Sequence, residues 1–158
     1  MNASVFSTPT DDRYFEDYAE GTVFIFGPIT VEETEVIAFA ERFDPQPMHI
    51  DPVKAAQGQF HGLIASGWHT VGLMMRLFVE HFLSAVAGLA SPGVDEVRWT
   101  RPVRPGDQLH LRVTVLEVRA SRSKPDRGMV VSLMEAINQR GEIVCSLKGM
   151  NFVLRRER

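Results

Sequence analysis

The chain has 158 residues, of which 44% are hydrophobic and 23% are charged. This is the composition of a globular domain and not of a disordered segment, and the length supports one core but not two. A single cysteine, Cys145, excludes an internal disulfide and fits a reducing cytoplasm. The N-terminus is polar and shows no signal peptide, so we expect a cytoplasmic protein.

The net charge of −3 is unevenly distributed along the chain. Residues 1–51 carry eleven acidic and two basic side chains, whereas residues 98–127 carry eight basic and three acidic ones. The basic stretch either receives an anionic group of a ligand or forms the solvated face of a hairpin. We expect neither a nucleic-acid nor a membrane partner.

The chain begins with an arm and a strand. We expect residues 1–14 to form a loose arm and residues 15–158 to form a single domain. Residues 22–29 are rich in β-forming side chains and end at a Gly-Pro pair, which predicts a strand followed by a turn.

Two helical segments are expected next. Thr30 and Glu33 have the spacing of a capping box, which predicts a helix that begins there and ends before Pro45. Asp51 followed by proline is typical of a helix N-cap, and it predicts a short helical turn that runs through Ala56.

A long helix is predicted from about Ser66 to Ala90. Its apolar side chains leave little of the circumference polar, so this helix should be mostly buried. The apolar positions are Trp68, Val71, Leu73, Met74, Met75, Leu77, Phe78, Val79, Phe82, Leu83 and Val86. His69, Arg76 and Glu80 interrupt the apolar run, which excludes a membrane span.

The last third of the chain has the pattern of strands. Apolar and polar residues alternate over residues 109–115, and similar strands fit residues 94–101, 129–138 and 142–154. Consecutive strands joined by short turns must be antiparallel. The sequence therefore predicts an α+β fold in which an antiparallel sheet of about five strands wraps one long helix.

The segment that follows the first helix has the residues for proton chemistry. Asp44 and His49 lie five positions apart, and Pro45 and Pro47 stiffen the backbone between them. Because proline disfavours a helical conformation in the residue before it, Asp44 and Gln46 should be extended. A carboxylate and an imidazole held together can bind a water molecule and move protons to and from it.

Three segments resemble the MaoC-like, R-specific enoyl-CoA hydratase family. They are residues 44–49 (Asp-x-Gln-Pro-x-His), residues 60–67 (Phe-His-Gly-Leu-Ile-Ala-Ser-Gly) and residues 101–107 (Arg-Pro-Val-x-Pro-Gly-Asp). The resemblance covers about residues 15–154. It implies the hotdog fold, a long central helix wrapped by an antiparallel sheet, which agrees with the architecture predicted from periodicity.

The resemblance also implies roles for individual residues. Asp44 and His49 would bind the attacking water, one of them acting as base and the other as acid, in an order that the sequence leaves open. Gly62 would donate its backbone N–H to the thioester carbonyl, where negative charge builds up. Gln46, at a position where the family usually has Asn, would orient the water or the substrate together with Ser66 and His61.

The implied reaction is the reversible hydration of a trans-2-enoyl thioester to a 3-hydroxyacyl thioester. The substrate would be an acyl-CoA, no cofactor and no metal would be needed, and the chain would form a homodimer. Candidates for contacts with the CoA phosphates, from charge alone, are Arg98, Arg101, Arg104, Arg122 and Lys124.

Several alternatives remain open at this point. Asp44 can serve as the cap of a turn, His61 as a structural residue and Ser66 as a helix N-cap. A hotdog thioesterase would use a carboxylate of the central helix, for which Glu80 is the candidate, although Arg76 four residues earlier is its expected partner. A third alternative is a hotdog protein that binds acyl-CoA without catalysis.

Overall fold

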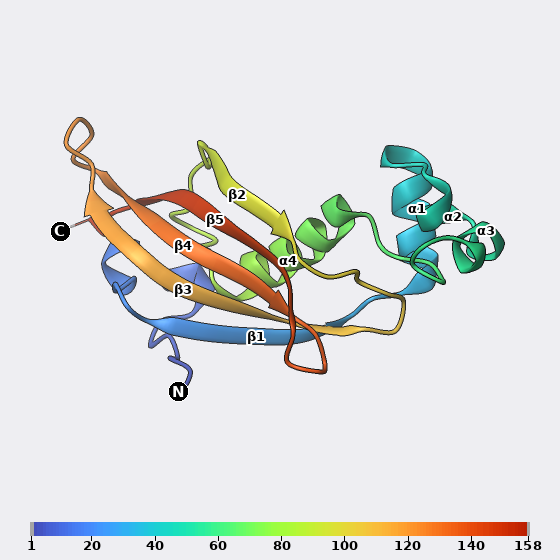
Figure 1. Cartoon of the computed structure of the whole chain (residues 1–158). Coiled ribbons are helices and arrows are strands. Elements are labelled where there is room, and N and C mark those ends of the chain that lie inside the picture. The colour runs from blue at the N-terminus through green and yellow to red at the C-terminus, as the bar shows by residue number, and fades with distance from the viewer. Residues whose placement is uncertain (1, 158) are drawn as a thin grey trace.

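The computed structural model describes residues 2–157. A five-stranded antiparallel sheet curves around helix α4, and three shorter helices gather at one end of it (Figure 1). The strands are β1 (Val23–Thr30), β2 (Gly93–Trp99), β3 (Gln108–Ala120), β4 (Arg127–Ile137) and β5 (Ile143–Leu154). The helices are η1 (Thr10–Asp12), η2 (Phe15–Asp17), α1 (Glu33–Phe43), α2 (Pro47–Ile50), α3 (Pro52–Gln57) and α4 (Gly67–His81). The predicted α+β architecture is confirmed.

The order of the strands in the sheet is β1-β3-β4-β5-β2. Strands β3, β4 and β5 follow one another through short connections, whereas β1 pairs with β3 and β2 pairs with β5 at the two edges. In β3 the alternating residues Leu109, Leu111 and Val113 are at most 1% exposed, because one face of the strand points toward α4. The period-two pattern in the sequence therefore identified the buried face of this strand correctly.

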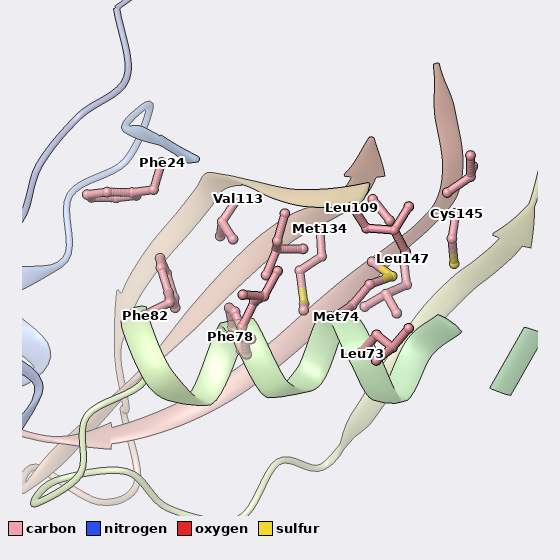
Figure 2. Packing of buried hydrophobic residues seen from close by; sticks show 14 of the residues in the cluster. Phe24, Leu73, Met74, Phe78, Phe82, Leu109, Val113, Met134, Cys145 and Leu147 are labelled. Atoms are coloured by element: carbon pink, nitrogen blue, oxygen red, sulfur yellow. The ribbon is translucent and has the colours of Figure 1, made fainter. Parts of the chain in front are cut away.

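The core lies between α4 and the concave face of the sheet. Figure 2 shows Met74 and Phe78 of the helix, and Phe82 directly after it, pointing toward sheet residues that include Val113 and Met134. The rings of Phe78 and Phe82 stack with centroids 4.7 Å apart. Full burial of each such side chain contributes about 1.5–3 kcal/mol, so this layer holds the helix in place on the sheet.

Helix α4 ends at His81, nine residues earlier than the sequence predicted. Donors from the N-terminal part of the chain bind the carbonyls at this helix end. Arg13 donates to the carbonyl oxygens of His81 at 2.7 Å and of Phe82 at 3.0 Å, and the Tyr18 hydroxyl donates to Phe82 at 2.9 Å. Ser84 then accepts hydrogen bonds from the backbone of the next turn. These long-range donors cannot be recognised from helical periodicity.

The N-terminal segment is packed against the domain, whereas the sequence predicted a loose arm. Arg13 is only 3% exposed, and the Phe6 ring stacks on Phe24 with centroids 4.1 Å apart. The Ser4 N–H donates to the carbonyl oxygen of Val23 at 2.6 Å. The arm thus covers one end of the core, and its apolar and charged contacts explain why it is ordered.

The predicted capping box at Thr30 does not form. Thr30 remains in β1, where its hydroxyl hydrogen-bonds to the side chain of Gln108 in β3, and Glu32 is the N-cap position of α1. Pairing with the neighbouring strand therefore prevails over the local capping signal. The second predicted cap is confirmed, because the Asp51 carboxylate accepts from the N–H groups of Val53 and Lys54.

One face of α4 is apolar but not buried. Trp68, Met75 and Val79 are 58%, 44% and 51% exposed, although the sequence placed them in the core. Their spacing puts them along one side of the helix, opposite the buried side that packs on the sheet. Within residues 2–157 no helix is both long and apolar enough to cross a membrane.

We predict that Arg13→Met lowers the free energy of unfolding by about 2–4 kcal/mol, because it leaves buried carbonyl groups at the end of α4 without their charged donor. Urea unfolding followed by far-UV circular dichroism measures this difference. Arg122→Met, on an exposed connection, is the matched control and should change the stability by less than about 0.5 kcal/mol. Equal effects of both substitutions would show that the contacts of Arg13 are not stabilising.

Candidate active site

The two residues predicted for proton chemistry lie at the junction of α1, α2 and the N-terminal end of α4 (Figure 1). Helix α1 ends at Phe43, and the Asp44 N–H still donates to Ala40 at 2.8 Å. Asp44 itself is not helical, but its φ of −154° and ψ of 66° are not extended either, whereas Gln46, with φ −81° and ψ 141°, is extended as predicted. Pro47 then occupies the first position of the one-turn helix α2, which carries His49. The sequence predicted the stiffness of this segment but not its helical turn.

The side chains of Asp44 and His49 face each other. Oδ2 of Asp44 lies 3.3 Å from Nε2 of His49, and His49 is 4% exposed. On the other side of the ring, Nδ1 lies 2.7 Å from the carbonyl oxygen of Ile64. Because a carbonyl oxygen only accepts, Nδ1 carries a proton. A neutral ring therefore presents its lone pair at Nε2, beside the carboxylate.

Two donors hold the Asp44 carboxylate. The Gln46 side-chain amide donates to Oδ1 at 2.7 Å, and the Ser66 hydroxyl donates to Oδ2 at 2.7 Å. These hydrogen bonds, first that of Gln46 and then that of Ser66, lower the pKa of Asp44 below its usual 3.8, and the nearby His49 acts in the same direction. Asp44 is therefore ionised at neutral pH. Ser66 stands at the N-cap position of α4, but its hydroxyl binds Asp44 in place of the helix backbone.

A cavity of about 420 Å³ opens beside this pair. Asp44, Gln46 and His49 form part of its polar lining. The rest of the wall is mostly apolar, with two threonines and one arginine. These residues are Phe60, Ile64, Ala65, Gly67, Trp68, Thr70, Trp99, Thr100, Arg101, Pro102 and Val103. An apolar cavity with a few converging polar groups is the usual form of a small-molecule site.

The structure does not support the predicted role of Gly62. Its N–H donates to the carbonyl oxygen of Ala55 at 3.0 Å, and the residue lies five positions before α4 begins. Gly67 has the properties that the role requires. It is the first residue of α4 and lines the cavity, and the N–H groups of the first helical turn have no acceptor within the helix. The helix start predicted at Ser66 was the signal that pointed to Gly67.

His61 is not part of the cavity. It is exposed, its φ of 56° lies in the left-handed region, and it belongs to the turn between α3 and α4. Of the predicted orienting residues, the structure thus brings Gln46 and Ser66 to Asp44 but leaves His61 outside.

The predicted phosphate-binding residues lie in different places. Arg101 lines the cavity and pairs with Glu142 at 3.0 Å. Arg104 donates to the carbonyl oxygen of Phe60 at 2.6 Å and so fixes the loop before α4. Arg122 and Lys124 belong to the β3–β4 connection, at the end of the sheet far from α1–α3 (Figure 1). Arg98 lies in β2 and is also absent from the cavity lining, so of the five candidates only Arg101 lines the cavity.

The carboxylate considered for a thioesterase is also remote from the cavity. Glu80 pairs with Arg76 at 2.5 Å, as the spacing predicted, and both side chains are substantially exposed. Within residues 2–157, no group of three or more His, Cys, Asp or Glu side chains could hold a metal ion.

Comparison with known families decides the classification of the chain. The family model described as MaoC like domain matches residues 17–136. The chain belongs to the MaoC-like domain family. Helix α4, Asp44 and His49 all lie within the matched segment.

Similar proteins agree with this classification. The chain is similar to a MaoC-like dehydratase from Rhodospirillum rubrum, with 41% identity, a TM-score of 0.85 and coverage of 92% of this chain and 99% of that one. It is 31% identical to the uncharacterized protein YdeM of Bacillus subtilis, over 79% of this chain and 87% of the relative. It is 33% identical to 3-hydroxyacyl-thioester dehydratase Z of Mycobacterium tuberculosis, over 57% of this chain and 61% of the relative.

We predict that Ser66→Ala reduces the free energy of unfolding by about 1–2 kcal/mol at neutral pH, because Asp44 loses a donor to its charged form. A carboxylate whose pKa is lowered in the folded protein stabilises the fold above its unfolded pKa and loses this effect as the pH falls through the folded pKa. The difference between the two proteins should therefore be complete above about pH 5 and shrink below about pH 4.

Urea unfolding at a series of pH values from 3 to 7 tests this expectation, with the exposed Ser123→Ala as control. A stability difference that stays constant over the whole range would contradict a hydrogen bond from Ser66 to an ionised Asp44.

Proposed function

We propose that this protein catalyses the reversible hydration of a trans-2-enoyl thioester to a 3-hydroxyacyl thioester, with CoA as the carrier. The observation that carries the proposal is the approach of Oδ2 of Asp44 to Nε2 of His49, 3.3 Å apart, beside a largely apolar cavity. The similarity to a 3-hydroxyacyl-thioester dehydratase supports the same reaction class. The placement of Arg101 at the cavity supports a phosphate-bearing carrier.

The water molecule is bound by two acceptors. A neutral His49 offers Nε2, and Asp44 offers a carboxylate oxygen, so one water can donate a proton to each of them. Its oxygen lone pairs then point away from both acceptors and into the cavity, toward C3 of the enoyl group. Placing the reactants in this way removes much of the entropic cost of the reaction.

His49 is the proton carrier in this scheme. As the water oxygen forms its bond to C3, one water proton moves to Nε2 and the C2–C3 π electrons shift toward the thioester oxygen. The imidazolium then returns a proton to C2 while the carbonyl bond re-forms, so that one water is added overall. Asp44 remains ionised because Gln46 and Ser66 lower its pKa, and its charge stabilises the imidazolium.

The enolate oxygen requires its own donor. The N–H of Gly67 lies at the N-terminal end of α4, where the helix dipole also favours negative charge. We assign the thioester carbonyl to this position, because donors aimed at developing charge stabilise the transition state more than the ground state. The thioester itself acidifies C2, so the scheme uses no cofactor and no metal ion.

We predict that Asp44→Asn and His49→Gln each lower kcat for crotonyl-CoA by about 10²–10⁴-fold, the range expected for loss of a general acid–base group. Loss of the enoyl-thioester absorbance measures the reaction. Binding of crotonyl-CoA should survive in both variants. Both tryptophans of the chain line the cavity, so their fluorescence can be used to measure this binding. His61→Ala, outside the cavity, should retain wild-type turnover.

Full hydration by Asp44→Asn would refute the proposed mechanism. Hydrolysis of the thioester by both the wild type and this variant would instead establish a thioesterase.

We further propose that the chain forms a homodimer through the exposed apolar face of α4 and the free edge of β2. Met75 and Val79 supply apolar surface on the helix, and β2 pairs with β5 on one side only, which leaves unpaired backbone groups on the other.

Val79→Lys should therefore convert the dimer to a monomer at micromolar concentration, because a charge in an apolar contact is costly. Size-exclusion chromatography with light scattering measures the mass. Val5→Lys, at a residue that is 90% exposed on the N-terminal segment, should leave the dimer intact. A monomeric wild-type chain would refute the proposal.

A further inference from the structure

We propose that the indole N–H of Trp99 is a second hydrogen-bond donor to the thioester carbonyl, beside the N–H of Gly67. This inference rests on the proposed function and adds a catalytic residue to it. Trp99 is the last residue of edge strand β2, where its backbone pairs with Cys145 of β5, and its side chain lines the cavity.

The distance between the two donors is limited by covalent geometry. A Cβ atom built on Gly67 would lie 2.5 Å from Nε1 of Trp99. In any residue, Cβ and N are bonded to the same Cα and lie about 2.5 Å apart. Nε1 of Trp99 is therefore at most about 5 Å from the nitrogen of Gly67. Two donors this close can both reach one oxygen at about 2.9 Å.

The indole of Trp99 packs against two neighbours. The rings of Trp68 and Trp99 meet edge to face, with centroids 5.2 Å apart and planes at 78°. The indole lies against the backbone of Gly67, where any larger residue would collide with it. Trp99 is 46% exposed and its side chain lines the cavity, so Nε1 is available to a water or a ligand there. An indole nitrogen is a donor only, so the group that completes this contact must be an acceptor.

A donor at this point has a catalytic effect and not only a binding effect. When the water oxygen bonds to C3, the π electrons move to the thioester oxygen, and a hydrogen bond to that oxygen becomes stronger in the transition state. The indole N–H keeps its own proton throughout, so His49 remains the group that transfers a proton from the water to C2. Two neutral donors on one oxygen form the same arrangement as the oxyanion holes of acyl-transfer enzymes.

Trp99→Phe removes this donor and keeps an aromatic ring. We expect kcat for crotonyl-CoA to fall about 10–10²-fold, near the lower end of the loss for an oxyanion donor, while KM changes less than about threefold. A residue that only formed the cavity wall would change KM first.

The carbonyl stretch of bound crotonyl-CoA gives a readout that does not depend on turnover. In the Asp44→Asn variant with both tryptophans intact, ¹³C-edited infrared difference spectra should show the C=O band shifted to lower frequency. Trp99→Phe should reverse a large part of this shift. Trp68→Phe removes the other indole N–H of the same cavity, and it should keep the shift.

An isosteric replacement separates the N–H from the shape of the ring. The chain has only two tryptophans, so in a Trp68→Phe background a tryptophan auxotroph places β-(3-benzothienyl)alanine at position 99 alone. This side chain has sulfur in place of the N–H. It should lose the shift that tryptophan produces.

The outcomes distinguish this inference from the proposed function. If Asp44→Asn abolishes hydration but neither change at Trp99 alters kcat or the C=O band, the role of Trp99 is refuted and the hydratase proposal stands. If no hydration is seen but the band shift depends on the indole N–H, the contact is supported and the hydratase proposal fails. If the Asp44→Asn variant with both tryptophans intact produces no shift of the C=O band, the inference is overturned.

Discussion

The packing of α4 against the concave face of the sheet is the constraint on which the other features depend. Met74 and Phe78 anchor the helix in the core, and Arg13 closes its C-terminal end through two backbone carbonyls. With the helix fixed along its length and at its end, its first residues have a defined position. Gly67 therefore lines the cavity as part of a helix and not of a loop, and Ser66 stands at the N-cap position before it.

The pair formed by Asp44 and His49 is positioned from this helix start. Asp44 hydrogen-bonds to Ser66, and His49 hydrogen-bonds to the carbonyl of Ile64, two residues earlier in the same segment. The segment is itself tied to the connection between β2 and β3, because the Ala65 N–H donates to the carbonyl oxygen of Val103 at 2.7 Å. Carboxylate, imidazole and helix N-terminus thus share one short stretch of backbone as their common support. A shift of that stretch would move all three together, which preserves their mutual geometry.

The sequence was sufficient for features with a local or periodic cause. The alternation in β3, the N-cap at Asp51 and the break in helix before Pro45 all follow from neighbouring residues. It was insufficient where a partner distant in the chain decides the outcome. Thr30 carries a good capping signal but lies beside Gln108 in the sheet, 78 positions away. The role of Gly62 came from the family resemblance, and the sequence cannot show that Ala55 accepts the N–H of Gly62.

Trp99 illustrates the same limit at the candidate site. As an isolated tryptophan at a strand end it has no sequence signal for catalysis, and only the sheet edge brings its ring against Gly67. This contact also explains the glycine, since any side chain at position 67 would displace the indole. The edge strand and the helix N-terminus therefore constrain each other. A change of either residue would disturb the packing of the other, so positions 67 and 99 form one structural unit at the cavity.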